Sequence, residues 1–164
     1  MTDNERVAAV FDELADLLEI EDANPFRVRA YRNAARTVRG LGRELRELLA
    51  EGRDLTTLPG IGKDLAEKID EILRTGTTPA LEEVHRSVPA SLEELLQVPG
   101  LGPKRVKALY TQLGIENIVQ LREAVEAGRL RELSGFGAKT EQAILAAIAA
   151  RRTSERRHLL RDAE

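Results

Sequence analysis

The chain has 164 residues, a formal net charge of −3, no cysteine and two histidines. This composition excludes a disulfide framework and thiolate zinc sites, and it leaves too few histidines for a histidine-rich metal cluster. The N-terminus is acidic where a signal peptide would be basic and then apolar, and no apolar run approaches the roughly 20 residues of a membrane span. We therefore expect a cytoplasmic chain with no membrane partner.

The amino-acid content favours helices. Alanine, leucine, glutamate and arginine are abundant, whereas aromatic residues make up only 3%. These abundant residues lose little rotamer freedom in a helix, so an all-α protein is predicted. We expect two small helical lobes, residues 1–78 and 79–152, and a C-terminal tail or linker at 153–164. The boundary is placed at 75–79, which combines helix-stop and turn-forming residues.

Charge is sorted along the first part of the chain. Residues 1–22 contain eight acids and one base, a net charge of −7, whereas residues 23–46 contain seven arginines and one glutamate, a net charge of +6. Arginines recur in the basic segment every three or four residues, which predicts one face of a helix. They are Arg29, Arg32, Arg36, Arg39 and Arg43. Either the acidic first helix pairs with this face, or the face binds the phosphates of a nucleic acid.

One motif occurs three times, at 58–62, 98–102 and 133–137. Each copy is an apolar residue, proline or serine, glycine, an apolar residue and glycine, and a lysine follows within two positions. An amphipathic stretch after each copy predicts a helix, so the repeated unit is helix, glycine turn, helix. The backbone N–H groups of such a turn and of the next helix point outward and form an anion site. The predicted phosphate-binding residues are Gly60, Gly62, Lys63, Gly100, Gly102, Lys104, Arg105, Gly135, Gly137 and Lys139.

Two other phosphate-binding motifs do not fit. The chain lacks the phosphate loop of ATP-binding proteins, and no strand precedes the glycines as a dinucleotide fingerprint requires. The alternative that the glycines only close helical hairpins stays open. Backbone contacts to phosphate carry no base identity, so any binding to nucleic acid should be independent of sequence.

The repeated units resemble the helix-hairpin-helix motif of DNA repair and replication proteins. Residues 24–35 (NPFRVRAYRNAA), the first hairpin and residues 64–71 (DLAEKIDE) together resemble the N-terminal region of family X DNA polymerases, especially the bacterial and archaeal type. The resemblance implies a helical lyase domain that binds the 5′-phosphate side of a gap, followed by a segment that grips the duplex. It implies binding to gapped, nicked or abasic DNA in repair. We accordingly expect a nucleoid-associated monomer, with other repair proteins as further partners.

The same resemblance assigns the lyase lysine to Lys68. In the family this lysine forms a Schiff base with the sugar aldehyde at an abasic site, which releases deoxyribose phosphate by β-elimination. The chemistry needs an unprotonated amine, whereas a free lysine has a pKa of about 10.4. Asp64, Glu67 and Asp70 are close in sequence and favour the ammonium form. A catalytic lysine and an ordinary helix lysine are therefore both open.

The resemblance implies further site residues. DNA contacts are expected for Arg27, Tyr31 and Arg32, and the charge pattern adds Arg29 and Arg36. A Na⁺ or K⁺ ion is expected on backbone carbonyls of the first two hairpins, and no other cofactor is required. These carbonyls belong to Thr56, Leu58, Ile61, Leu96, Val98 and Leu101.

No Asp-x-Asp sequence occurs in the chain. Family X polymerases hold magnesium with such a carboxylate pair, so we expect no DNA polymerisation by this chain alone. The chain is either a part of a longer polymerase or a free-standing relative. Three functions stay open: a structure-directed DNA-binding module, a lyase, and a helical protein-interaction module.

Overall fold

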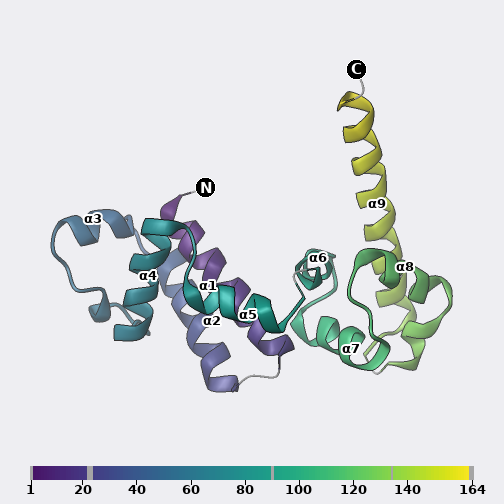
Figure 1. Ribbon diagram of the computed structural model, residues 1–164, viewed down its shortest axis with the longest axis horizontal. Helices are drawn as coiled ribbons and strands as arrows, with labels where there is room; N and C mark the ends of the chain where they lie inside the picture. Colours follow the sequence, from purple (N-terminus) through teal and green to yellow (C-terminus); the bar gives the residue numbers. More distant parts are fainter. Residues whose placement is uncertain (1, 22–23, 90, 134, 163–164) are drawn as a thin grey trace. The chain divides into compact units, whose positions relative to one another are not determined.

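The computed structural model describes residues 2–21, 24–89, 91–133 and 135–162, with side chains up to residue 150. The regular elements of these residues are all helices, which confirms the predicted fold class (Figure 1). The chain divides into two compact units, Met1–Val88 and Pro89–Glu164. The elements are α1 (Asp3–Ile20), α2 (Pro25–Arg39), α3 (Leu45–Ala50), the 3₁₀ helix η1 (Leu55–Thr57), α4 (Lys63–Thr75), α5 (Pro79–Ser87), α6 (Leu92–Leu96), α7 (Pro103–Leu113), α8 (Ile118–Glu126), the 3₁₀ helix η2 (Arg129–Glu132) and α9 (Ala138–Asp162).

Local sequence signals start the first two helices. Thr2 caps α1 by accepting a hydrogen bond from the Glu5 N–H at 3.1 Å, and the Glu5 side chain accepts one from the Thr2 N–H at 3.3 Å. This reciprocal capping box satisfies two N–H groups that the helix itself leaves unpaired. Asn24 caps α2 through the Phe26 N–H at 2.9 Å, and Pro25 occupies the first helical position. Proline suits that position because its fixed φ is helical and it lacks an N–H.

The core of the first unit lies between α1 and α2, which pack side by side, and α4 and α5 also contact α1 (Figure 1). Its buried side chains are mostly aliphatic because the chain has few aromatic residues. Burial of these apolar surfaces is the main favourable term in folding the unit. The core includes Phe11, Leu14, Leu18, Tyr31, Ala34, Val38, Leu45, Ile69 and Ile72.

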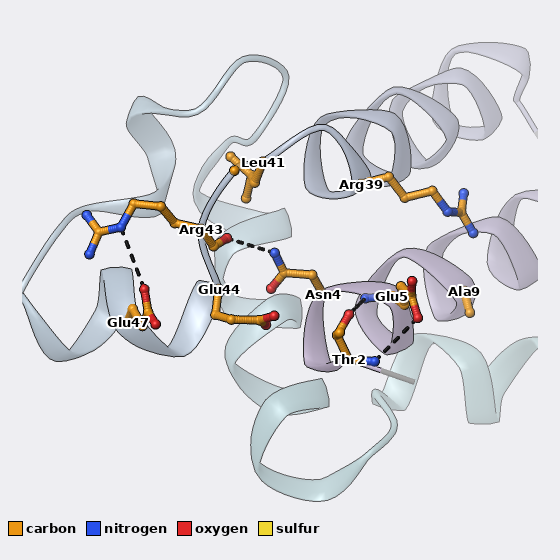
Figure 2. A pocket seen from close by; sticks show the side chains of 10 residues that line it. Thr2, Asn4, Glu5, Ala9, Arg39, Leu41, Arg43, Glu44 and Glu47 are labelled. Atoms are coloured by element: carbon orange, nitrogen blue, oxygen red, sulfur yellow. Dashed lines mark hydrogen bonds and ion pairs between the residues drawn. The ribbon is translucent and has the colours of Figure 1, made fainter.

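A buried polar side chain fixes the loop between α2 and α3. Asn4 is 8% exposed, and its Nδ2 donates to the Arg43 carbonyl at 2.8 Å. Its Oδ1 accepts a hydrogen bond from the Leu45 N–H, also at 2.8 Å. Figure 2 shows Asn4 pointing from α1 toward the backbone of this loop. One amide thus satisfies two backbone groups near the start of α3, where the side chain of the N-cap residue, Glu44, makes no capping hydrogen bond.

The two units meet later in the sequence than predicted. The signals at 75–79 do end one helix and begin the next, since α4 ends at Thr75, Gly76 has φ +86°, and α5 begins at Pro79. However, α5 packs against α1 and buries Leu81 and Val84, so it belongs to the first unit. The division falls after Val88 because the apolar face of α5, and not the turn before it, decides where the core ends.

The second unit contains α6 to α9 and η2. The ends of α6 and α7 contact each other around the second glycine turn, and α8 contacts both η2 and α9. Its core is aliphatic apart from the ring of Phe136. It includes Leu92, Leu95, Val106, Leu109, Leu121, Leu130 and Ile144. Across the described parts of both units, no helix has the length and apolar character to cross a bilayer.

Candidate nucleic-acid interface

The first two glycine turns have the same backbone geometry. In each, a proline is followed by a glycine with positive φ, +75° at Gly60 and +90° at Gly100. A hydrogen bond closes the turn from residue 61 to the residue 58 carbonyl at 3.1 Å, and from residue 101 to the residue 98 carbonyl at 3.0 Å. These are features of type II turns, in which the third position needs glycine because other residues rarely adopt positive φ.

The third turn matches them at its glycines. Gly135 has φ +88°, and Phe136, which stands between the two glycines, is 6% exposed. The Glu141 N–H donates to the Gly137 carbonyl at 3.0 Å, as the corresponding N–H groups do after the other two turns. The serine at position 134 lies outside the described residues. The third hairpin therefore shares with the other two the positive-φ glycine, the buried residue after it and the first backbone hydrogen bond of the helix.

The second glycine of each turn is not required by the fold. Gly62 and Gly102 are the N-caps of α4 and α7, with φ −87° and −90°, values that any residue adopts. A Cβ built on Gly62, Gly102 or Gly137 meets no atom within 4 Å. No side chain caps α4 or α7. The first-turn N–H groups of both helices therefore face open space, where the helix dipole favours an anion.

An exposed lysine accompanies each turn, and the acids around it differ. Lys63, Lys104 and Lys139 lie in the first turns of α4, α7 and α9, and all three are exposed. Asp64 adds a negative charge to the first turn of α4, and Glu141 adds one to that of α9. The first turn of α7 contains no acid. The second hairpin therefore offers an anion the most uniformly positive helix start.

In the first unit, α2 lies against the first hairpin. Thr37 Oγ1 donates to the Pro59 carbonyl at 2.8 Å, and a Cβ on Gly60 would lie 4.0 Å from the Cβ of Asn33. Arg29 comes four residues before Asn33, and Arg36 comes three residues after it. Residues at these spacings share one side of a helix. Both arginines therefore lie on the side of α2 that meets the hairpin.

Part of the arginine face pairs with the acidic first helix. Arg32 is half-buried, and its guanidinium lies 3.0 Å from Asp16 and 2.7 Å from Glu19. Arg39 forms an ion pair with Asp12. Arg43 lies beyond the end of α2 and pairs with Glu47 of α3 and with Glu51. The first of the two alternatives, pairing with the acidic first helix, thus holds for Arg32 and Arg39.

The remaining arginines of α2 are exposed and form no ion pair with the described residues. Arg27, Arg29 and Arg36 are exposed, and within the described residues no ion pair involves them. The Arg29 guanidinium lies over the ring of Phe26, 5.0 Å from its centroid, and Phe26 is 73% exposed. An exposed ring and unpaired arginines suit the bases and phosphates of a nucleic acid. These residues are the stronger candidates for direct contact.

The sequence predicted a direct DNA contact for Tyr31, but the structure buries this side chain. Its side chain is 2% exposed and packs against Phe11, with ring centroids 5.8 Å apart. Tyr31 is on the apolar face of α2 that covers α1, one residue before Arg32. It supports the shape of the first unit but presents no surface to a ligand.

Lys68 is held as an ammonium ion. Its side chain is 14% exposed, and its Nζ lies 2.8 Å from Asp64 Oδ2. Burial lowers the pKa of Lys68, but the hydrogen bond and charge of Asp64, with Tyr31 and Glu71, outweigh it and raise that pKa above its ordinary value. A Schiff-base lysine needs the opposite shift. Of the three acids near it in the sequence, Asp64 is the one in contact with Lys68, whereas Asp70 pairs with Arg74.

Arg105, predicted to bind phosphate, is turned toward the protein backbone. It is half-buried, and its guanidinium donates to the Gly100 carbonyl at 2.6 Å and to the Gly135 carbonyl at 3.4 Å. The sequence had predicted a phosphate contact for Arg105 as well as for Lys104. The structure separates them, because Lys104 is exposed and Arg105 contacts both glycine turns of the second unit.

The carbonyl groups expected to bind a monovalent cation lie in and beside the turns. Leu58 and Val98 accept the hydrogen bonds that close the turns. The other four carbonyls, of Thr56, Ile61, Leu96 and Leu101, accept no hydrogen bond from outside their own helices in the described parts of the chain. Neutral carbonyl oxygens are the donor type that hard cations prefer. The donor set therefore fits such an ion.

The first unit also has a groove of about 700 Å³ between α1 and the loop before α3 (Figure 2). Its charged side chains are of both signs. Arg39 and Arg43 lie beside Glu5, Glu44 and Glu47, and the Arg43 Nε lies 3.7 Å from Glu47. Because these arginines are already paired, the groove is a poorer phosphate site than the glycine turns.

Comparisons with known proteins agree with this architecture. A helix-hairpin-helix domain family matches residues 2–78, and a SAM-like helix-hairpin-helix tandem family matches residues 92–150. The DNA polymerase/3′-5′ exonuclease PolX of Bacillus subtilis is 36% identical over 142 residues, which are 87% of this chain and 24% of that protein. The Holliday junction branch migration complex subunit RuvA of a Polaromonas species is 23% identical over 99 residues, 60% of this chain and 52% of that protein.

The comparisons confirm the resemblance to family X DNA polymerases and the three-hairpin description. The chain spans about a quarter of the length of the PolX relative and about half that of the RuvA relative.

Proposed function

We propose, from the helix-hairpin-helix domains that match both parts of this chain, that it binds gapped or nicked DNA without sequence preference in DNA repair. The observation that carries the proposal is the repeated helix start. Gly62, Gly102 and Gly137 leave the space before their helices open, although the fold does not require glycine there. A phosphate can approach these N–H groups closely, and the lysine of each first turn adds charge.

Each unit contributes its own phosphate contacts to this proposal. The first unit offers the turn at 60–62 together with Arg29, Arg36 and Lys63. The second unit offers two turns, at 100–102 and 135–137. A chain with separate contact surfaces binds two stretches of backbone at once, which suits a duplex interrupted by a gap or nick. Similarity to a DNA polymerase over 87% of the chain supports this role.

The salt dependence of binding tests the proposal. Affinity is measured by fluorescence anisotropy on gapped, nicked and intact duplexes of one sequence, from low to physiological salt. Each phosphate contact contributes about −0.9 to the slope of log affinity against log salt, so a steep slope is expected. Lys104→Ala should reduce the slope by about 1 on every sequence.

Arg74→Ala is the matched control. Arg74 is in the last turn of α4, at the opposite end of the helix from the first glycine turn, and pairs with Asp70 at 3.0 Å. Its loss should leave the slope unchanged. Weak binding that does not vary with salt would refute the proposal and favour the protein-interaction alternative. Equal affinity for intact and gapped duplexes would refute the preference for interrupted DNA.

A second candidate function is lyase action by Lys68 on a 5′-deoxyribose phosphate. The similarity to PolX and the nearly buried position of Lys68 support it, whereas the raised pKa of Lys68 opposes it at neutral pH. In the step, the neutral amine attacks the sugar aldehyde, water leaves as the imine forms, and β-elimination then breaks the C3′–O bond. Because the ammonium must first lose its proton, activity should increase as pH rises toward the Lys68 pKa.

Borohydride trapping decides whether this reaction occurs. Reduction of the imine should link the chain covalently to DNA that carries a 5′-deoxyribose phosphate, and Lys68→Ala should abolish the link. Lys107→Ala, which removes a lysine of α7 that the proposal does not place at phosphate, is the matched control that retains it. No adduct, or an adduct that survives Lys68→Ala, would exclude the lyase function.

We also propose that Na⁺ or K⁺ supports DNA binding at the first two hairpins. The carbonyls of Thr56, Leu58 and Ile61 would hold the ion in the first, and those of Leu96, Val98 and Leu101 in the second. The ion would supply positive charge next to a bound phosphate. Replacement of K⁺ by tetramethylammonium at equal ionic strength should then weaken binding, and unchanged affinity would refute the proposal.

A further inference from the structure

Arg105 connects the second and third hairpins. It is in the first turn of α7, where its guanidinium donates to the Gly100 carbonyl at 2.6 Å and to the Gly135 carbonyl at 3.4 Å. These two glycines occupy the same place in their turns, and both have positive φ. The guanidinium also lies 5.8 Å from the centroid of the Phe136 ring. One side chain therefore contacts equivalent points of two turns that are 35 residues apart in the sequence.

The sequence separates Arg105 from the repeated phosphate-binding pattern. A lysine follows all three turns, but the residue five positions after the first glycine differs in each copy. It is Leu65 in the first hairpin, Arg105 in the second and Thr140 in the third. If this position contacted phosphate in every hairpin, the same residue type should occur there in all three copies, as the lysine does. The arginine is present only in the second hairpin, which shares its unit with the third glycine turn.

The chemistry of arginine explains why this position needs it. The guanidinium has five N–H donors in a planar fork, so it can serve two carbonyls and still place its face toward a ring. Its hydrogen bonds are strengthened by charge. A lysine has the same charge, but its single ammonium group cannot reproduce the fork or the stacking.

We propose that Arg105 is a positioning residue that fixes the third glycine turn against the second, so that both turns meet the DNA backbone as one unit. This inference rests on the proposed DNA binding and deepens it. It gives the third hairpin a share in binding, and it assigns Arg105 to the joint between the hairpins in place of a phosphate contact.

The first test uses the free protein. Amide NMR spectra are compared for the full chain, Arg105→Lys and Lys104→Ala, with a thermal melt of each variant to show that it folds. Arg105→Lys should shift the signals of Gly135 and Phe136 as strongly as that of Gly100. Lys104→Ala, the neighbouring cation with an exposed side chain, should leave the third turn unchanged. Unchanged third-turn signals in Arg105→Lys would overturn the inference.

The second test is a double-mutant cycle on DNA affinity with Arg105→Lys and Lys139→Ala. If Arg105 holds the third turn in place, the loss caused by Lys139→Ala should be smaller by about threefold or more in the Arg105→Lys background. A phosphate contact by Arg105, or a general loss of stability, would instead give independent effects. Additive losses, or full retention of affinity in Arg105→Lys, would overturn the inference.

The two tests separate this inference from the proposed function. If the full chain fails to bind DNA at low salt, the proposed function is refuted, and the NMR comparison still decides whether Arg105 joins the turns. If Arg105→Lys does not fold, Phe136→Leu replaces it, because this change removes the ring and leaves the two hydrogen bonds. It should shift the Gly135 signal in the same direction by a smaller amount, and an unchanged signal would count against the proposal.

Discussion

The two glycines of the first hairpin should respond in opposite ways to substitution by alanine. Gly60 has φ +75°, whereas Gly62 has φ −87°, and an added Cβ meets no atom closer than 4.0 Å at either position. Steric overlap with the protein therefore cannot explain an effect of alanine at either position. Alanine at position 60 would strain the backbone, whereas alanine at position 62 would obstruct an approaching ligand.

For Gly60→Ala, the left-handed conformation costs about 1–2 kcal/mol. Alanine also lowers the entropy of the unfolded chain, which offsets about 0.4–1 kcal/mol of this cost. The free energy of unfolding should therefore fall by about 1 kcal/mol. For the 88-residue first unit, that loss lowers the melting temperature by about 4–8 °C.

For Gly62→Ala, the change in stability should be within about 0.5 kcal/mol. Alanine is a poorer N-cap than glycine, but it also reduces the entropy of the unfolded chain, and these effects oppose each other. DNA affinity should fall more, because the methyl group stands where a phosphate would approach the first-turn N–H groups. A lost hydrogen bond to a charged group is worth about 1.5–3 kcal/mol, or roughly a tenfold to hundredfold weaker affinity.

Urea unfolding and fluorescence anisotropy on a gapped duplex measure the two effects separately. Gly102→Ala repeats the comparison at the second hairpin, where φ is −90° and no atom lies within 4 Å of the added Cβ. If Gly62→Ala bound DNA as tightly as the original chain, the close approach of phosphate to this helix start would be refuted. If it unfolded more easily than Gly60→Ala, the assignment of strain to the positive-φ glycine would be refuted.

Three further predictions concern side chains of the first unit. Asn4→Ala should lower the free energy of unfolding by about 2 kcal/mol, since two buried hydrogen bonds are lost, and a shift in urea midpoint worth less than about 0.5 kcal/mol would contradict this. Asp64→Asn should lower the pKa of Lys68, measured by NMR titration of its side chain. That pKa is raised in the folded chain, so the ion pair stabilises the fold below about pH 10.4, and this stabilisation is lost as pH rises through the folded pKa. An unchanged Lys68 pKa in the variant would show that Asp64 does not cause the shift. Arg36→Ala should weaken DNA binding and reduce the salt slope by about 1, whereas Arg39→Ala should have less effect because its guanidinium already pairs with Asp12; equal losses would refute this difference.

Local sequence signals were sufficient for the helices and the glycine turns. Proline followed by glycine specifies the type II turns at residues 58–61 and 98–101, and the next glycine begins the helix. The capping box at Thr2 and the Asn24 cap act over two or three residues. Preferences of this kind depend on near neighbours along the chain, so a motif repeated three times predicted three similar hairpins.

The state of each charged side chain depended on partners from other helices. An arginine every third or fourth residue marks a helix face, but it does not reveal that Arg32 and Arg39 pair with α1 while Arg36 stays unpaired. Similarly, Tyr31 stands beside arginines in the sequence and yet is buried against Phe11. These outcomes follow from how α1 packs on α2, and spacing along one helix does not determine that.

The sequence by itself determined the helical class, the three turns and the lysines beside them, because these follow from short-range backbone preferences and composition. Only the tertiary structure decided that α5 joins the first unit, that Lys68 is held by Asp64, and that Arg105 connects two turns. Each of these depends on contacts made after the helices pack, when burial and distance set which polar groups meet.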